Sequence, residues 1–211
     1  MTQTHLLRAD KLTHGPIQNL THQWPAGVSW VCGDEGCGKT TLLRLLAGDV
    51  QPTSGTVSMP AGGVFWANLQ DAVHDQTSVT VCWTTLRQRY PNWQDDLQHD
   101  LTDALGMTPH LDKRLNMLSA GSRRKVTLIA ALASGATVTL LDQPFAALDT
   151  VSVQLVLDFL HEASDHTQRA WIVADYEAPH DLRLATVLNL SESSSLGLSK
   201  STGQSQSSGQ I

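Results

Sequence analysis

One short segment constrains the fold of this chain more than any other: Gly33-Asp34-Glu35-Gly36-Cys37-Gly38-Lys39-Thr40, which matches the pattern GxxxxGK[ST]. Its glycines let successive backbone N–H groups turn inward around phosphate oxygens. The helix that follows presents the positive end of its dipole to the same point. An apolar run at residues 28–32 precedes the loop, and an amphipathic run at residues 40–47 follows it. This order predicts a strand, a phosphate-binding loop and a helix, which is typical of α/β proteins.

The side chains of this loop suit a nucleotide polyphosphate. We expect the ammonium group of Lys39 to reach the β- and γ-phosphates, and the hydroxyl of Thr40 to bind Mg²⁺. The carboxylates of Asp34 and Glu35 weaken such binding by like-charge repulsion unless they point to solvent or pair with a cation. Cys37 is expected to be a small residue that fits the turn. The candidate nucleotide-binding residues of this segment are Gly33, Gly36, Cys37, Gly38, Lys39, Thr40 and Thr41.

The charge balance and the hydropathy exclude two classes of protein. The chain carries 14 Lys and Arg against 20 Asp and Glu, a net charge of −6. This argues against a nucleic-acid partner, which would require a basic stripe to neutralise phosphates. No stretch has the roughly 20 predominantly apolar residues that a membrane-spanning helix needs. The N-terminal residues also lack the basic and apolar regions of a signal peptide.

The length of 211 residues predicts one domain. Its three cysteines, Cys32, Cys37 and Cys82, form no CxxC pair and fit a reducing cytosol. We expect a domain over residues 1–190. Residues 191–211 are mostly Ser, Gly and Gln without apolar periodicity, and they predict a flexible tail.

The order of the expected elements predicts the kind of sheet. Residues 1–32 alternate apolar and polar side chains between turn signals, which indicates a small antiparallel β unit that leads into a strand at residues 28–32. The apolar runs 138–141 and 170–173 are strands with a helix between them, and this alternation favours parallel pairing. Residues 78–125 are polar and helical in character, and they form an insertion.

Two later segments connect the phosphate loop to a known family: Leu118-Ser119-Ala120-Gly121-Ser122, and Leu140-Leu141-Asp142-Gln143-Pro144 followed by Ala147-Leu148-Asp149. In this order they resemble the nucleotide-binding subunits of ABC transporters, over residues from about 5 to 190. The resemblance implies a P-loop NTPase of the ABC ATPase type: a mainly parallel core sheet, an antiparallel β subdomain and a helical insertion. The motifs NxLSAGxxRxV and LLDxPFxALD look most like those of the haem-exporter ATPase family of cytochrome c maturation, although related small exporter subunits share them.

The resemblance assigns metal and nucleotide contacts within one chain. It implies that Asp142 holds Mg²⁺ together with Thr40, directly or through water. Gln70 matches the glutamine loop, which contacts the metal and also contacts the membrane partner. His14 occupies the position of an aromatic residue that stacks on adenine, and a plain turn histidine is an equal alternative. The implied cofactors are ATP and Mg²⁺.

The same resemblance implies contacts between two chains. Ser119 and Gly121 would touch the γ-phosphate bound by the opposite subunit of a head-to-tail dimer, and Asp149 would lie at the dimer seam. Two copies would enclose two MgATP and drive separate transmembrane permease subunits. The chain is therefore expected to be cytoplasmic and peripheral on the inner face of the cell membrane. The run Arg123-Arg124-Lys125 is most simply a charged helix start after the signature.

Three positions depart from the family pattern. Gln143 replaces the glutamate that polarises the attacking water, Asp175 replaces a histidine, and Ser122 replaces the glutamine of the signature. Loss of a general base commonly costs about 10²–10⁴ in rate. Gln143 is either a deliberate substitution that traps bound nucleotide or part of a natural degeneracy, which we favour because it also accounts for Asp175 and Ser122. Two functions follow: a transport ATPase, in which Gln143, Asp175 and Gln70 serve the reaction, or a hydrolysis-deficient module that acts through nucleotide-dependent dimerisation.

Overall fold

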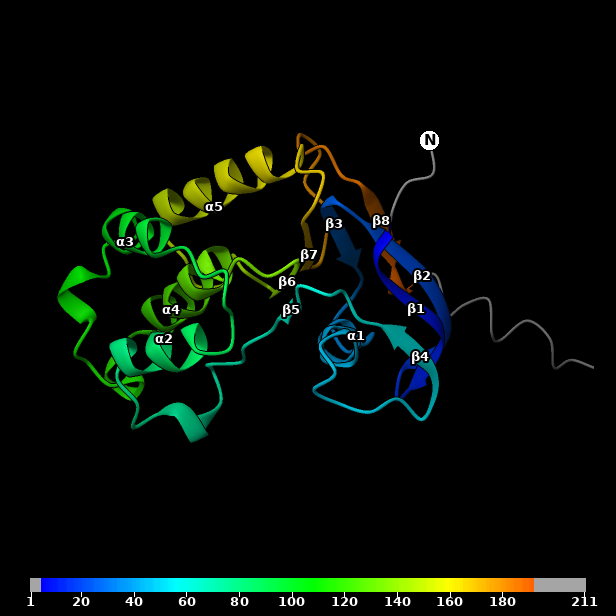
Figure 1. The fold of residues 1–211 in the computed structure, drawn as a ribbon, viewed down its shortest axis with the longest axis horizontal. Coiled ribbons are helices and arrows are strands. Elements are labelled where there is room, and N and C mark those ends of the chain that lie inside the picture. The colour runs from blue at the N-terminus through cyan, green and yellow to red at the C-terminus, as the bar shows by residue number, and fades with distance from the viewer. Residues whose placement is uncertain (1–4, 192–211) are drawn as a thin grey trace, which may run out of the picture.

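Two β-sheets organise the chain, with helices between and around them (Figure 1). The structure is a computed structural model and describes residues 5–191. The larger sheet has five strands, paired in parallel throughout, in the order β5 (Val64–Phe65), β6 (Val138–Asp142), β7 (Ala170–Ala174), β3 (Gly27–Cys32) and β8 (Thr186–Asn189). This confirms the predicted α/β fold with a parallel core sheet.

The central strands are apolar on both faces because helices cover both faces. Every residue of β7 is buried, as expected for parallel strands enclosed on two sides. One face, with Trp30 and Trp171, packs against α4 (Ala120–Ala133) and α5 (Thr150–Ala163). The other face packs against α1 (Lys39–Leu46).

The smaller sheet confirms the expected antiparallel β unit. Its order is β2 (Ile17–Pro25), β1 (His5–His14) and β4 (Ser54–Ser58), with β1 antiparallel to both neighbours. Its buried side chains share one core with α1. The strand expected at residues 28–32, into which this unit leads, is β3 of the parallel sheet.

The region from 78 to 125 is helical, and its helices pack beside α4. They are α2 (Val79–Arg87) and α3 (Asp95–Ala104), with the 3₁₀ turns Thr108–His110 and Leu115–Met117. The indole N–H of Trp83 donates to the carbonyl of Val126 at 3.0 Å and fixes α2 to α4. Whether this region behaves as a separate subdomain stays a prediction.

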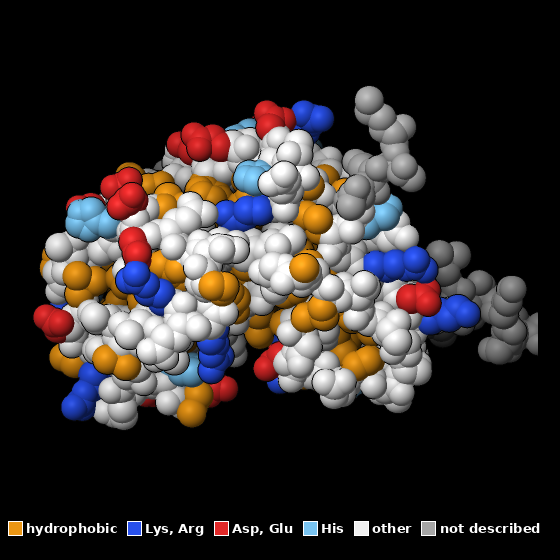
Figure 2. Space-filling view, in the orientation of Figure 1, with side chains coloured by type: hydrophobic (Ala, Val, Ile, Leu, Met, Phe, Trp, Pro, Cys, Tyr) orange, Lys and Arg blue, Asp and Glu red, His pale blue; other side chains and the backbone are white. Residues whose placement is uncertain are grey.

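The structure leaves one sequence expectation untested and adds one strand that the sequence did not indicate. The tail expected at 191–211 lies outside the described residues, apart from Ser191. The sequence does not predict strand β8, because its four residues are too few to show an apolar period. In residues 5–191, no helix has the length and apolar character needed to cross a bilayer. On the face shown in Figure 2, acidic and basic side chains are interspersed rather than gathered by sign.

Gly135 ends α4 at a point where the chain passes very close to the α2–α3 connection. Its φ is +66°, and an added Cβ would overlap the carbonyl oxygen of Asn92. We predict that Gly135→Ala lowers the free energy of unfolding by about 3 kcal/mol, since a left-handed alanine costs about 1–2 kcal/mol and the overlap adds a similar amount.

Gly106→Ala is the matched control for this prediction. Gly106 has a φ of +67° but nothing within 4 Å of the added Cβ, so only the backbone cost applies. Urea denaturation measures both variants. Equal destabilisation of the two would contradict the close approach at Asn92.

Candidate nucleotide-binding site

The site lies at the carboxyl edge of the parallel sheet, where open α/β sheets bind their ligands. Strand β3 leads directly into the phosphate loop, β6 ends at Asp142, and β7 ends one residue before Asp175. Asp142 pairs with Ala174 in the register of β6 and β7. Parallel pairing therefore gathers three segments that are far apart in the sequence.

The phosphate loop uses its glycines for left-handed backbone. Gly33, Gly36 and Gly38 have φ values of 148°, 77° and 105°. An added Cβ at Gly38 would lie 2.7 Å from Pro16 Cγ, so the β1–β2 turn rests against the start of α1. His14 is the last residue of β1, so this contact places it near the phosphate loop. The Nδ1 atom of His14 is buried and has no hydrogen-bond partner among residues 5–191.

Lys39 is folded across the loop. Its side chain is almost fully buried, and Nζ donates to the carbonyl oxygens of Gly33 at 2.5 Å and Asp34 at 2.8 Å. The ammonium also lies 4.7 Å from the ring centroid of Tyr176. A phosphate in the loop would exchange these carbonyl acceptors for its own oxygens, so the cation is held where an anion needs it.

The acidic residues of the loop do not pair with a cation in the structure. Asp34 and Glu35 are exposed, which is the first of the two outcomes considered from the sequence. The hydroxyl of Ser191 donates to Asp34 Oδ2 at 3.2 Å and accepts from the Asp34 N–H at 3.0 Å. Cys37 packs its sulfur against the backbone of Gly33, as expected of a small residue in the turn.

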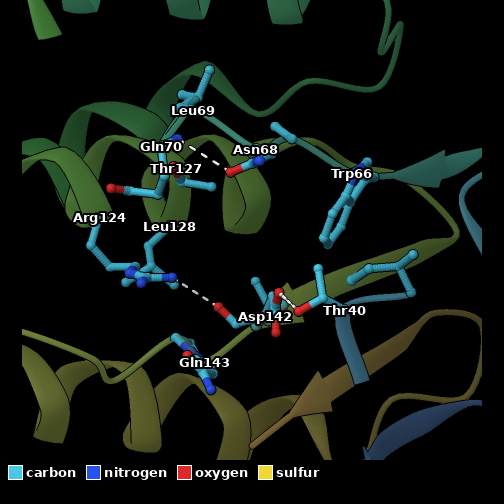
Figure 3. Close-up of a pocket in the computed structure, with 14 residues that line it drawn as sticks. Thr40, Trp66, Asn68, Leu69, Gln70, Arg124, Thr127, Leu128, Asp142 and Gln143 are labelled. Atoms are coloured by element: carbon cyan, nitrogen blue, oxygen red, sulfur yellow. Dashed lines mark hydrogen bonds between the residues drawn. The ribbon is translucent and has the colours of Figure 1, made fainter. Parts of the chain in front are cut away.

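Thr40 and Asp142 meet at one end of a cavity of about 150 Å³ (Figure 3). The Thr40 hydroxyl donates to Asp142 Oδ2 at 2.6 Å, while Asp142 Oδ1 is buried without a partner among the described residues. Burial raises the pKa of Asp142, and the Thr40 hydrogen bond opposes that rise. An unpaired carboxylate oxygen beside a hydroxyl is the hard oxygen donor set that Mg²⁺ prefers, so these residues fit the metal.

Three further candidates surround that pair. Gln70 and Gln143 line the same cavity, and Figure 3 shows them on opposite sides of it. Gln143 has a φ of 45°, which is uncommon for a residue with a side chain, and its N–H donates to the Ala174 carbonyl at 2.8 Å. Asp175 is half-buried beside them, and its Oδ1 accepts from the N–H of Tyr176 at 2.8 Å.

The remaining candidates form a separate cluster outside this cavity. Ser119 caps α4 and accepts from the N–H of Ser122 at 3.1 Å. Gly121 approaches the Ala147 carbonyl so closely that a Cβ would overlap it. Asp149 caps α5, and hydrogen bonds from Lys125 and Ser152 hold its pKa well below the usual range.

Sequence reasoning missed Arg124. Its guanidinium is half-buried, lines the cavity and donates to the main-chain carbonyl of Asp142 at 2.9 Å. Burial lowers the pKa of this guanidinium. A usable signal was present: three consecutive cations follow the start of a helix, where the dipole favours acidic side chains instead.

The comparison with known proteins gives one consistent result. The sequence matches the ABC transporter family over residues 18–146. It is 30% identical over 149 residues to the cytochrome c biogenesis ATP-binding export protein CcmA of Pseudomonas syringae, covering 64% of this chain and 69% of that protein. It is 32% identical over 133 residues to the taurine import ATP-binding protein TauB of Ruegeria pomeroyi, covering 58% of this chain and 49% of that protein.

A further relative is similar in sequence, and one solved structure shares the fold. The petrobactin import ATP-binding protein FpuD of Bacillus anthracis is 29% identical over 189 residues, covering 80% of this chain and 68% of that protein. The solved structure of a putative ABC transporter ATP-binding protein from Pyrococcus furiosus has a TM-score of 0.68 at 24% identity, covering 87% of this chain and 96% of that one. Relatives named for import and for export match equally well, so the resemblance to the haem exporters is not singled out. The chain belongs to the ABC transporter family and carries its ATP-binding domain.

Proposed function

We propose that this chain binds MgATP between its phosphate loop and Asp142, dimerises around the nucleotide, and drives separate membrane permease subunits. The observation that carries the proposal is the meeting of Thr40 and Asp142 at 2.6 Å beside an unpaired carboxylate oxygen, next to a buried phosphate-loop lysine. Members of this family bind ATP and normally use Mg²⁺. We place the chain in the cytoplasm, on the inner face of the membrane.

Different residues would bind the phosphates, the base and the metal. The N–H groups of the loop and Lys39 bind the phosphates, and His14 lies on the side where the base would stack. Thr40, Asp142 and Gln70 would hold Mg²⁺, which when bound neutralises the phosphate charge. Arg124 fixes the end of β6 by its bond to the Asp142 carbonyl.

A second copy would complete the site. Ser119, Gly121 and Asp149 lie outside the cavity that contains Thr40 and Asp142, which supports their use toward the nucleotide of another chain. Ser119 is exposed at the start of α4, where a hydroxyl and the helix dipole both favour an anion. A head-to-tail homodimer satisfies this geometry.

Turnover is expected to be slow. Gln143 has the cavity position suited to orient a water, but an amide is no base at neutral pH. Asp175 places a carboxylate near Asp142, where an imidazole could have donated a hydrogen bond to phosphate. The alternative function, a module that binds ATP and dimerises without hydrolysis, is favoured by these same two residues.

We also propose that the transported substrate is haem and that the direction of transport is export. Export of haem is suggested by the wording of the signature and by one relative named for cytochrome c biogenesis, whereas others are named for taurine and petrobactin import. The adjoining genes decide between them. Membrane subunits that handle haem support export, and a gene for an extracytoplasmic binding protein overturns it.

Lys39→Ala should weaken MgATP binding by about 30-fold or more, because truncating one partner of a buried charge pair commonly costs about 2–5 kcal/mol. Isothermal titration measures the affinity, and thermal unfolding checks that the variant is folded. Lys113→Ala is the control, since Lys113 lies in the helical region away from the loop. Unchanged affinity in folded Lys39→Ala would reject the nucleotide site.

Gln143→Glu combined with Asp175→His should raise steady-state phosphate release by about 10²–10⁴, because it restores a general base and a hydrogen-bond donor. Gln88→Glu, at the exposed end of α2, adds the same charge elsewhere and should change nothing. If the double variant binds ATP but still turns over at background, the hydrolase function is excluded and the non-catalytic module remains.

A further inference from the structure

The three cations at the start of α4 are not a solvated helix face. The Arg123 and Lys125 side chains are only 13% and 15% exposed, and each of the three reaches a different segment. Arg123 bonds to the stretch around Gln70, Arg124 to the end of β6, and Lys125 to Asp149. The simple interpretation of a charged helix start is therefore incomplete.

Arg123 makes the most extensive of these contacts. Its Nε donates to the Leu69 carbonyl at 2.6 Å, one terminal nitrogen to the Asp71 carbonyl at 2.8 Å, and the other to Asp75 Oδ1 at 2.6 Å. Leu69 and Asp71 are the two neighbours of Gln70. The planar guanidinium thus holds the backbone on both sides of the glutamine, a geometry that a lysine ammonium cannot reproduce.

The segment around Gln70 has little regular structure to hold it. It lies between β5 and the 3₁₀ turn Ala72–His74. Among residues 5–191, the Gln70 N–H donates only to the side chain of Asn68, at 3.3 Å. The buried Leu69 side chain anchors the segment to the core, and Arg123 connects the carbonyls of Leu69 and Asp71, on either side of Gln70, to α4.

The other end of the connection is the signature. The backbone N–H of Arg123 donates to the carbonyl of Ser119 at 2.9 Å, within the first turn of α4. One residue therefore joins a candidate γ-phosphate contact of the opposite subunit to a candidate metal contact of its own subunit. Three charge-assisted hydrogen bonds are a stiff connection, because such bonds are about twice as strong as neutral ones.

We propose that Arg123 is a positioning residue that locks the glutamine loop to the signature helix, so that the two shift together when nucleotide binds. The inference deepens the proposed function and rests on it for the identity of the ligand. Arg123 itself does not line the cavity that contains Thr40 and Asp142. Its effect passes through the backbone on either side of Gln70.

Hydrogen exchange of the full chain, with and without MgATP, tests this proposal. In Arg123→Gln we expect amides in residues 68–76 to exchange about tenfold faster, because this segment opens locally once its bonds are lost. MgATP should still protect residues 33–41, whereas the protection it gives at 68–76 should be lost. Arg123→Lys and Asp75→Asn should give intermediate effects, since each keeps part of the contact.

Arg87→Gln is the matched control. Arg87 makes an ion pair of the same length, 2.6 Å, with Asp95, but both side chains are more than half exposed. If Arg123→Gln changes residues 68–76 no more than Arg87→Gln does, or leaves their response to MgATP intact, the positioning role is overturned. If Arg123→Gln fails to fold, Arg123→Lys and Asp75→Asn decide by the same criterion.

The same experiment separates a failure of the proposed ATP binding from a failure of the role of Arg123. If MgATP gives the wild-type chain no protection at residues 33–41, ATP binding is rejected. The tenfold change at 68–76 in the free protein then still decides whether Arg123 holds the loop. That change supports the holding contact, and its absence overturns it.

Discussion

The hydrogen bond between Thr40 and Asp142 is the contact on which the site depends. It joins residues 102 positions apart in the sequence, and it exists because β3 and β6 end at the same edge of a parallel sheet. The apolar runs of these strands fix the sheet, and the helices on its two faces keep water from it. Each of the two residues belongs to a local motif, but it is the packing of the core that brings this candidate metal-binding pair together. Destabilising the packing of either strand would separate the two oxygens.

Much of this arrangement could be predicted from the sequence because its determinants are local. The glycine pattern of the phosphate loop and the apolar runs of β6 and β7 each carry a period or a motif that identifies the element. Strand β8 carries neither, since it is a short edge strand with one buried residue, Leu188. Its place beside β3 is decided by tertiary pairing.

Part of the candidate site could also be predicted from the sequence. Gln70, Asp142 and Gln143 were placed by family motifs, and the structure brings them around one cavity. The run of three cations signals that these side chains have partners, but not which ones, because the acceptor of Arg124 and two of the three acceptors of Arg123 are backbone carbonyls. Every residue has a backbone carbonyl, so the sequence does not indicate which carbonyl an arginine will reach. The identity of the three acceptors of Arg123 is visible only when the loop is folded.

The close approach of Gly121 to the Ala147 carbonyl has a consequence for how this protein can vary. Ala147 is exposed and is itself in a left-handed conformation, with a φ of 62°, which is uncommon for a residue with a side chain. Because the two segments touch at this point, the effects of substitutions at positions 121 and 147 should not be additive. A larger side chain at position 121 becomes tolerable only after the backbone near 147 has moved, which constrains the order in which such changes can accumulate during evolution.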